Sequence, residues 1–202
     1  MGKGILVVLS GPSGTGKGTI CKSFLDKNKD VKLSVSCTTR TPRDGEVHGV
    51  NYFFTEKEKF EDMIKKDEFL EYANVYGNYY GTPKAYVDDM LNKGYDVILE
   101  IDTQGALNVK EKFEDGVYIF IMPPSLKELE NRIVGRGSET EETLKKRLGA
   151  ATGEIKLAEK YNYAVINDTI DEAVKKIESI IIAEKCKIHR AKNNIQVFKE
   201  VN

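Results

Sequence analysis

Short apolar runs rich in β-branched residues alternate along this chain with longer segments that mix apolar and charged positions. The runs lie at residues 4–9, 96–101 and 117–122, and a weaker one lies at 163–166. Such runs are typical of strands that are buried on both faces of a parallel sheet. Because the segments between them have a helical period, the pattern predicts an α/β core in which helices flank a parallel sheet.

Two of the intervening segments carry a helical stripe, with apolar residues three and four positions apart. The stripes comprise Leu144, Leu148, Ala151, Ile155 and Ala158, and Ile170, Ala173, Val174, Ile177 and Ile181. Three pairs have the spacing of a capping box, in which two side chains satisfy free groups at a helix start. These pairs are Ser125 with Glu128, Ser138 with Glu141, and Thr169 with Glu172. We therefore expect a helix to begin at each of the three.

Residues 34–93 do not follow this alternation. They are rich in Tyr and Thr, with a turn signal at Asp44-Gly45 and a helix predicted to begin near Thr55. This segment is predicted to be a small mixed α+β subdomain, inserted between the first helix and the next core strand. The expected organisation is a core of residues 1–33 and 94–190 including a short helical lid at about 135–150, an inserted subdomain of 34–93, and a tail of 191–202.

Charge and cysteine content exclude several classes of protein. The 202 residues include 31 Lys and Arg against 32 Asp and Glu, which gives a formal net charge of −1. A chain without a basic field is not expected to bind nucleic acid or an anionic membrane. The first apolar run is too short for a signal-peptide core or a membrane span. Cys21, Cys37 and Cys186 lack paired spacing, which argues against disulfides or zinc. We expect a soluble cytoplasmic protein.

The strongest motif follows the first apolar run directly. It is the sequence Gly11-Pro12-Ser13-Gly14-Thr15-Gly16-Lys17, which has the spacing of a phosphate-binding loop. Glycines let backbone N–H groups converge on phosphate oxygens, the following helix adds its positive N-terminal end, and the lysine supplies a charge for the β- and γ-phosphates. The alternative is a glycine-rich turn without a ligand. The lysine and the strand–loop–helix context favour an ATP-binding loop.

Lys17 is followed by Gly18 and Thr19, whereas the phosphate-loop motif has serine or threonine directly after the lysine. The hydroxyl that would bind Mg²⁺ is therefore absent at that position. We expect phosphates, waters and a carboxylate, for which Asp102 is a candidate, to hold the Mg²⁺, because this ion keeps several waters. The order Gly-Lys-Gly-Thr resembles nucleoside monophosphate kinases, and this resemblance makes Thr19 a phosphate contact.

Further motifs extend the resemblance over nearly the whole chain. They lie at residues 34–46, 49–54, 69–73, 77–82, 99–105, 132–137, 146–148 and 166–168. Together, and in this order, they closely resemble the guanylate kinase family. The resemblance covers about residues 4–189 and implies a P-loop kinase fold whose inserted subdomain binds GMP.

The inserted subdomain has side chains suited to a guanine nucleotide. Two arginines and two tyrosines fit a monophosphate, because guanidinium forks match phosphate oxygens and phenol hydroxyls donate further bonds. They are Arg40, Arg43, Tyr52 and Tyr80. Guanine has donors at N1–H and at the N2 amino group, which carboxylates can accept; Glu71 and Asp102 are the candidates. Its O6 atom is an acceptor, to which the hydroxyls of Ser36 and Thr82 could donate. The resemblance assigns the same roles to these residues.

Alternatives remain open for some of these side chains. Arg43 could pair with Asp44 in a surface turn. Glu71 lies in an alternating strand, where its carboxylate could face the solvent. Asp102 could hold a metal-bound water instead of guanine, and Glu100 is a weaker candidate for the site.

A third group of candidates lies around the predicted lid. Arg132, Arg136 and Arg147 could close over the nucleotide and neutralise charge on the phosphoryl group in transit. The resemblance places Arg136 near the adenine and Arg132 and Arg147 near the phosphates, and it makes Asn167 an adenine contact. Arg132 could instead pair with Glu128, four positions earlier on the same helix.

The reaction implied by the resemblance is transfer of the γ-phosphoryl group from ATP to GMP, and to dGMP, with Mg²⁺. A phosphate acceptor is already ionised near neutral pH, so direct in-line transfer needs neither a protein nucleophile nor a base. Two alternatives are a guanylate-kinase-like module that binds phosphopeptides and a kinase for another nucleoside monophosphate. The protein is expected to be a monomer or a homodimer with ATP and GMP as its small-molecule partners.

Overall fold

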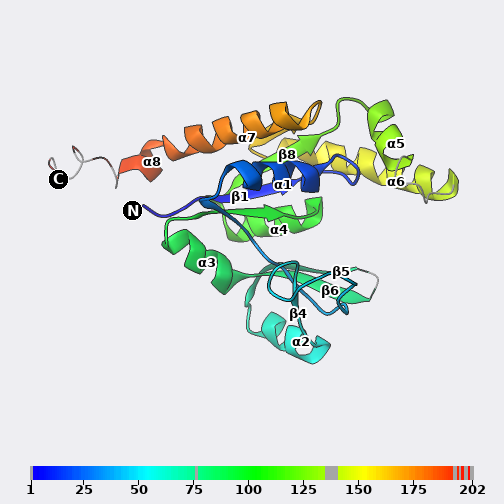
Figure 1. Ribbon diagram of the computed structural model, residues 1–202, viewed down its shortest axis with the longest axis horizontal. Coiled ribbons are helices and arrows are strands. Elements are labelled where there is room, and N and C mark those ends of the chain that lie inside the picture. The colour runs from blue at the N-terminus through cyan, green and yellow to red at the C-terminus, as the bar shows by residue number, and fades with distance from the viewer. Residues whose placement is uncertain are drawn as a thin grey trace.

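Two sheets and the helices around them make up the computed structural model, which describes residues 2–75, 77–134, 141–192, 195, 197 and 200 (Figure 1). The strands are β1 (Leu6–Ser10), β2 (Val31–Leu33), β3 (Cys37–Thr38), β4 (Phe53–Phe54), β5 (Phe69–Val75), β6 (Asn78–Pro83), β7 (Asp96–Glu100), β8 (Val117–Met122) and β9 (Tyr163–Ile166). The helices are α1 (Lys17–Lys27), α2 (Lys57–Lys65), α3 (Lys84–Asn92), α4 (Thr103–Lys112), α5 (Leu126–Val134), α6 (Glu141–Ile155), a 3₁₀ helix (Lys156–Lys160), α7 (Ile170–Lys185) and α8 (Ile188–Ala191).

The larger sheet has the strand order β2-β7-β1-β8-β9, and every pairing in it is parallel. All four predicted apolar runs form strands of this sheet, so the predicted α/β fold is confirmed. The edge strand β2 was not predicted. It has three residues, Lys32 lies at its centre and none of the three is buried, so it lacks the apolar run used to find the others.

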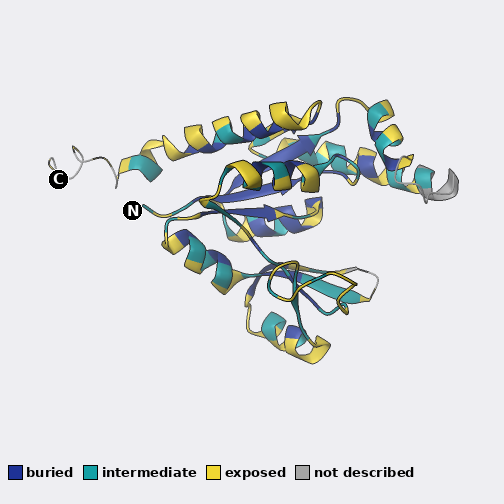
Figure 2. Ribbon diagram, in the orientation of Figure 1, coloured by how far each residue is buried: buried dark blue, intermediate teal, exposed yellow. Residues whose placement is uncertain are grey.

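Helices cover both faces of this sheet. Alternate residues of β1 point to opposite faces, so Val7 and Leu9 pack against α1 and α7, whereas Leu6 and Val8 pack against α3 and α4. Figure 2 shows the central strands as the buried layer between helices whose outer faces are exposed. The expectation that these strands are buried on both faces is confirmed.

The smaller sheet has the order β4-β3-β6-β5 and mixes one parallel pairing with antiparallel ones. It lies below the larger sheet in Figure 1 and carries α2 on one side. Its core is aromatic: Phe60 of α2 stacks on Phe69 at 4.3 Å and on Tyr79 at 5.2 Å between ring centroids. The predicted helix near Thr55 is confirmed but begins at Lys57.

Two of the predicted capping residues accept the expected hydrogen bonds. The Ser125 hydroxyl accepts from the Glu128 N–H at 3.1 Å, and the Thr169 hydroxyl accepts from the Glu172 N–H at 3.3 Å. The third pair begins at Ser138, which lies outside the described residues. The stripe that includes Ala158 is interrupted, because α6 ends at Ile155 and Ala158 lies in the 3₁₀ helix. No described helix has the length and apolar character needed to cross a membrane.

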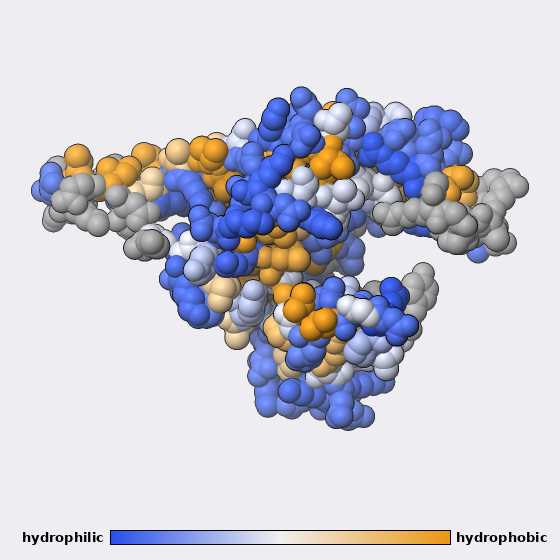
Figure 3. All heavy atoms as spheres, viewed as in Figure 1, coloured by the Kyte–Doolittle hydropathy of each residue, from blue (hydrophilic) through white to orange (hydrophobic). Residues whose placement is uncertain are grey.

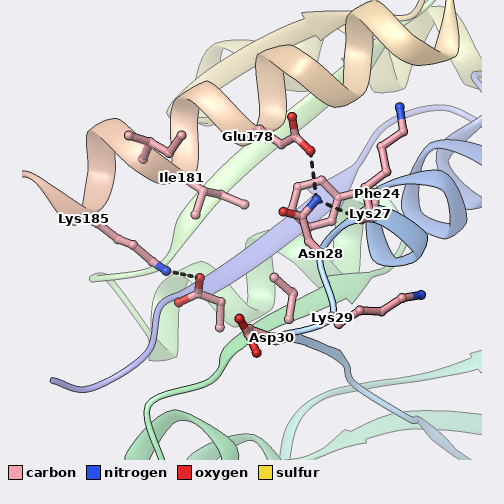
Figure 4. Close-up of a pocket in the computed structure, with 11 residues that line it drawn as sticks. Phe24, Lys27, Asn28, Lys29, Asp30, Glu178, Ile181 and Lys185 are labelled. Carbon is pink, nitrogen blue, oxygen red and sulfur yellow. Dashed lines mark hydrogen bonds and ion pairs between the residues drawn. The ribbon is translucent and has the colours of Figure 1, made fainter. Parts of the chain in front are cut away.

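A cavity of about 500 Å³ lies between α1, β2 and α7, at the opposite end of the strands from the phosphate loop (Figure 4). Beside it, the buried Asp96 carboxylate accepts from the Ile5 N–H at 3.0 Å and pairs with Lys185 at 2.6 Å. This carboxylate therefore fixes the start of β7 to both β1 and α7.

Replacing Asp96 with alanine should lower the free energy of unfolding by about 2–4 kcal/mol, because it strands a buried N–H group as well as removing an ion pair. Lys185→Ala is the matched control: it removes the ion pair but keeps the hydrogen bond to the Ile5 N–H group, so it should cost less than Asp96→Ala. Urea unfolding of both variants measures the difference. Equal losses would show that the ion pair, and not the Ile5 N–H group, carries the effect.

Candidate active site

The predicted phosphate loop joins β1 to α1 at the carboxyl edge of the larger sheet. Gly11, Gly14 and Gly16 have φ values of 142°, 90° and 86°, a region that favours glycine. The Lys17 ammonium donates to the carbonyls of Gly11 at 2.6 Å and Pro12 at 3.0 Å, so it lies folded over the loop. The expected strand–loop–helix arrangement is therefore present.

A carboxylate lies next to Gly18 of the loop. A Cβ atom at Gly18 would lie 3.4 Å from Oε1 of Glu100, the last residue of β7. Burial raises the pKa of Glu100, and the charge of Lys17 opposes this shift. The described residues contain no group of three Asp, Glu, His or Cys side chains able to hold a metal. One carboxylate beside a phosphate loop nevertheless suits a Mg²⁺ that keeps its waters.

The tip of the loop is inserted between α5 and α6. Arg147 donates to the Ser13 hydroxyl at 2.8 Å, and a Cβ atom at Gly14 would lie 2.9 Å from Ile133 of α5. Burial raises the pKa of Glu154, and the charge of Lys17 and the backbone of Ser13 oppose this shift. The predicted lid residue Arg136 lies outside the described residues.

Sequence reasoning missed Glu154, although a signal existed. Glu154 follows Arg147 by seven positions, which places both on one face of α6. The predicted arginine donates to the Ser13 hydroxyl, and the backbone of the same residue lowers the pKa of the missed carboxylate. This helix therefore holds the loop tip from one side.

Arg132 and Asn167 meet on the other side of the loop. The Asn167 amide is buried and donates to the Thr15 carbonyl at 2.7 Å. Arg132 donates through Nε to Glu128 at 2.8 Å and through both terminal nitrogens to the Asn167 carbonyl at 3.2 Å. The alternative pairing with Glu128 is thus present, together with a second contact that the sequence did not indicate.

Glu71 is buried, with 8% of the residue exposed, and its Oε1 accepts from the Thr82 hydroxyl at 2.6 Å. The solvent-facing alternative for this residue was wrong. A shift of register between Phe69 and Glu71 interrupts the alternation of β5, so consecutive residues turn inward. Burial raises the pKa of Glu71, the Thr82 hydroxyl opposes the shift, and the charge of Asp102 adds to it.

Asp102 approaches Glu71 from the other sheet. It is the N-cap of α4, where Oδ1 accepts from the Gly105 N–H at 2.8 Å, and the residue remains exposed. A Cβ atom at Gly105 would lie 3.1 Å from Oε2 of Glu71 and 3.5 Å from Oδ1 of Asp102. The Glu71 and Asp102 carboxylates therefore both lie next to Gly105. Ser36 lies just before β3, and its carbonyl accepts from the Phe53 N–H at 2.8 Å.

Arg40, Tyr52 and Tyr80 form a second group in the smaller sheet and its loops. The Arg40 guanidinium lies 5.5 Å from the centre of the Tyr52 ring, and the Tyr52 and Tyr80 rings are 5.9 Å apart. Glu46, which sequence reasoning passed over, pairs with Arg40 at 2.8 Å and accepts from the Arg43 N–H at 2.8 Å. Its pKa is lowered by the Arg40 contact and then by the Arg43 N–H. Arg43 itself is exposed.

The two halves of the site face each other across a hollow. Figure 3 shows the molecule indented between the core and the part of the chain that carries the smaller sheet. Burial raises the pKa of Tyr52, and the charge of Glu100 from the larger sheet contributes to that shift.

Comparisons with known proteins agree with this geometry. The family model described as guanylate kinase matches residues 3–184. A curated guanylate kinase from Clostridium tetani is 60% identical over 99% of this chain and 96% of its own length. One from Clostridioides difficile is 58% identical over 98% and 97%. A crystal structure of guanylate kinase from Anaplasma phagocytophilum has a TM-score of 0.75 at 36% identity, covering 94% of this chain and 90% of that one.

Proposed function

Because this chain belongs to the guanylate kinase family, we propose a division of labour in which the phosphate loop holds ATP and the smaller sheet holds GMP. The protein is an enzyme that transfers the γ-phosphoryl group of ATP to GMP, giving ADP and GDP. The observation that carries the division is the presence of an intact phosphate loop on the larger sheet and of a buried carboxylate, Glu71, on the smaller sheet.

The ATP phosphates lie on the loop formed by Gly11 to Thr19, in which Lys17 turns from the loop carbonyls toward the β- and γ-phosphates. The exchange costs little, because an ammonium that gives up neutral carbonyl acceptors gains charged ones. The exposed Thr19 hydroxyl at the first turn of α1 supplies a further phosphate contact.

Guanine lies against Glu71, Thr82 and Asp102, with Ser36 nearby. The Glu71 and Asp102 carboxylates accept from N1–H and the N2 amino group, and the Ser36 hydroxyl donates to O6. The Thr82 hydroxyl donates to Oε1 of Glu71 at 2.6 Å, so it orients that carboxylate instead of donating to O6. Adenine has an acceptor at N1, so its N1 atom and the buried Glu71 carboxylate would be two acceptors facing each other with no hydrogen between them. A site of this kind rejects the wrong base strongly, because its own polar groups are left unpaired. This argues against AMP as the acceptor.

The GMP phosphate lies between Arg40, Tyr52 and Tyr80, with the exposed Arg43 closing over it. Glu46 holds Arg40 in place before GMP arrives, so less side-chain freedom is lost on binding. The guanidinium also neutralises the acceptor phosphate, which would otherwise repel the incoming phosphoryl group.

The transfer itself requires positioning and charge stabilisation and no covalent intermediate. The second ionisation of a phosphate monoester lies near about pH 6, so the GMP oxygen is a nucleophile without a base. Lys17, Arg40 and Arg147 surround the path between donor and acceptor, and we assign Arg136 to the same lid. Mg²⁺ bound to ATP would draw charge from the phosphate oxygens, and Glu100, which lies beside Gly18 of the loop, is the carboxylate placed to hold its waters.

The test of this function is ADP release from ATP and Mg²⁺ with GMP, dGMP, AMP, CMP or UMP as acceptor. We expect rapid turnover with GMP, turnover with dGMP because no residue assigned here contacts the 2′-hydroxyl, and at least about 10³-fold lower kcat/KM with AMP. Preference for AMP would contradict the assignment of Glu71. Binding of GMP without any turnover would instead indicate a module that binds phosphate ligands.

A further inference from the structure

The side chain of Asn167 points into the phosphate loop and not outward. The residue is 4% exposed, and its Nδ2 lies 2.7 Å from the carbonyl oxygen of Thr15. Thr15 is itself fully buried, and its hydroxyl donates to the Pro12 carbonyl at 2.9 Å. The amide therefore contacts a part of the loop that solvent does not reach.

The same amide lies against Gly16, the residue before Lys17. A Cβ atom at Gly16 would be 2.6 Å from Nδ2 of Asn167, a distance that no real Cβ atom could keep. Gly16 also has a φ of 86° and is the N-cap of α1. The amide thus packs against the turn that orients Lys17 and the first N–H groups of the helix.

Asn167 is fixed by its own backbone. Its N–H donates to the Met122 carbonyl at 2.9 Å, which continues the pairing of β9 with β8. Its carbonyl accepts from both terminal nitrogens of Arg132 at 3.2 Å, and Arg132 is held at Nε by Glu128 at 2.8 Å. One residue therefore links α5, the end of the larger sheet and the phosphate loop.

The geometry of a peptide bond makes the Thr15 contact consequential. In a trans peptide the carbonyl of Thr15 and the N–H of Gly16 point in opposite directions. A hydrogen bond that holds the carbonyl toward Asn167 therefore directs the Gly16 N–H group to the other side of the loop. Convergent N–H groups on that side are what a phosphate-binding loop requires.

We propose that Asn167 is a positioning residue for phosphoryl transfer, which aims the Gly16 N–H group at the ATP phosphates by holding the Thr15 carbonyl, and that Arg132 acts through Asn167. This inference rests on the proposed function in that ATP occupies the loop. It differs from the role that the sequence resemblance gave to Asn167, which was contact with the adenine base. Phosphate binding and base recognition can be separated by experiment.

The experiment compares Asn167→Ala and Asn167→Asp with the wild-type enzyme, using ATP or ITP as donor and GMP as acceptor. ITP has a carbonyl where adenine has its amino group, so it reports on base recognition alone. We expect both variants to lower kcat/KM about tenfold or more with either donor, because each removes the donor to Thr15. The ratio of kcat/KM for ATP to that for ITP should stay within about twofold of wild type, and the GMP KM should not change.

Calorimetric binding of tripolyphosphate with Mg²⁺ gives an independent measure, since this ligand has no base and needs no turnover. Its affinity should fall by the same factor as the affinity for ATP. The proposal would be overturned in favour of adenine contact if the variants lost affinity for ATP but kept their affinity for tripolyphosphate. A large fall in the ratio of kcat/KM for ATP to that for ITP would have the same meaning. Unchanged affinity for both ligands would overturn it as well. Failure of wild-type enzyme to phosphorylate GMP would sink the proposed function but leave this binding test intact.

Asn28→Ala is the matched control for a merely structural effect. The Asn28 amide also donates to a backbone carbonyl, that of Phe24 at 3.0 Å, but at the far end of α1 (Figure 4). It should reduce stability without changing tripolyphosphate affinity. An equal loss of affinity in this variant would show that any loosening of α1 disturbs the loop, and would contradict a specific role for Asn167.

Discussion

Lys17→Met should lower kcat by at least about 10³-fold, the largest single effect expected in this protein. The lysine is the one side chain of the loop motif that brings a full positive charge to the transferring phosphoryl group, and methionine has a similar length without the charge. The ammonium donates to two carbonyls, at 2.6 and 3.0 Å, so the variant also loses these local bonds. Such partly exposed bonds contribute about 1 kcal/mol each, which leaves the fold intact.

Single-turnover kinetics with saturating ATP and GMP measures this effect, and calorimetry measures GMP binding. GMP affinity should stay within about twofold of wild type, because Lys17 makes none of the contacts proposed for GMP. Lys22→Met makes the same substitution at an exposed position of the same helix and should leave kcat unchanged. Survival of activity in Lys17→Met would show that the loop does not hold the phosphates of ATP in the way described.

Glu71→Gln should reduce kcat/KM for GMP by about 10²–10³-fold while the KM for ATP stays unchanged. Glutamine keeps the shape of the side chain but presents an NH₂ group or a single carbonyl to two guanine donors. The residue is 8% exposed, so water cannot replace the lost acceptor. Steady-state kinetics with varied GMP provides the measurement. Glu68→Gln, an exposed position three residues earlier, is the control and should behave as wild type.

The pH dependence of the same variant gives an additional test. Burial raises the pKa of Glu71, so the carboxylate is protonated at a higher pH than an exposed glutamate and kcat/KM for GMP falls earlier as the pH decreases. In Glu71→Gln this fall in kcat/KM at acid pH should be absent, and only the fall caused by protonation of the GMP phosphate should remain. An identical acid limb in both proteins would contradict an ionised Glu71 as the group that binds guanine.

Glu71→Gln should raise the stability of the folded protein, although it lowers the activity. A carboxyl group whose pKa is raised on folding stabilises the folded state at low pH, and that contribution is lost as the pH rises through the folded pKa. At pH 8 the ionised Glu71 is therefore a cost to folding, and Glu71→Gln should have a higher melting temperature than wild type. A lower melting temperature would show that Glu71 is retained for stability as well as for binding.

Features that depend on residues close together along the chain could be predicted from the sequence alone. The core strands were predicted because a continuous run of β-branched residues is typical of a strand that is buried on both faces of a sheet. The structure has these strands as β1, β7, β8 and β9. The phosphate loop was predicted because its glycines and Lys17 must lie at fixed spacing between a strand and a helix. The short strand β2 escaped detection because its pattern is too brief and too polar to differ from a loop.

Which distant side chains share a site depends on how the segments pack in the folded protein. The Asn167 amide contacts Thr15, 152 positions earlier in the chain, because β9 lies beside β8 and β8 beside β1. Glu71 turns inward because of an irregularity in β5, which a regular alternation of strand residues does not reveal. Local sequence patterns report the conformation that a segment prefers, whereas these contacts follow from the packing of segments against one another, and that packing is specified by the whole chain.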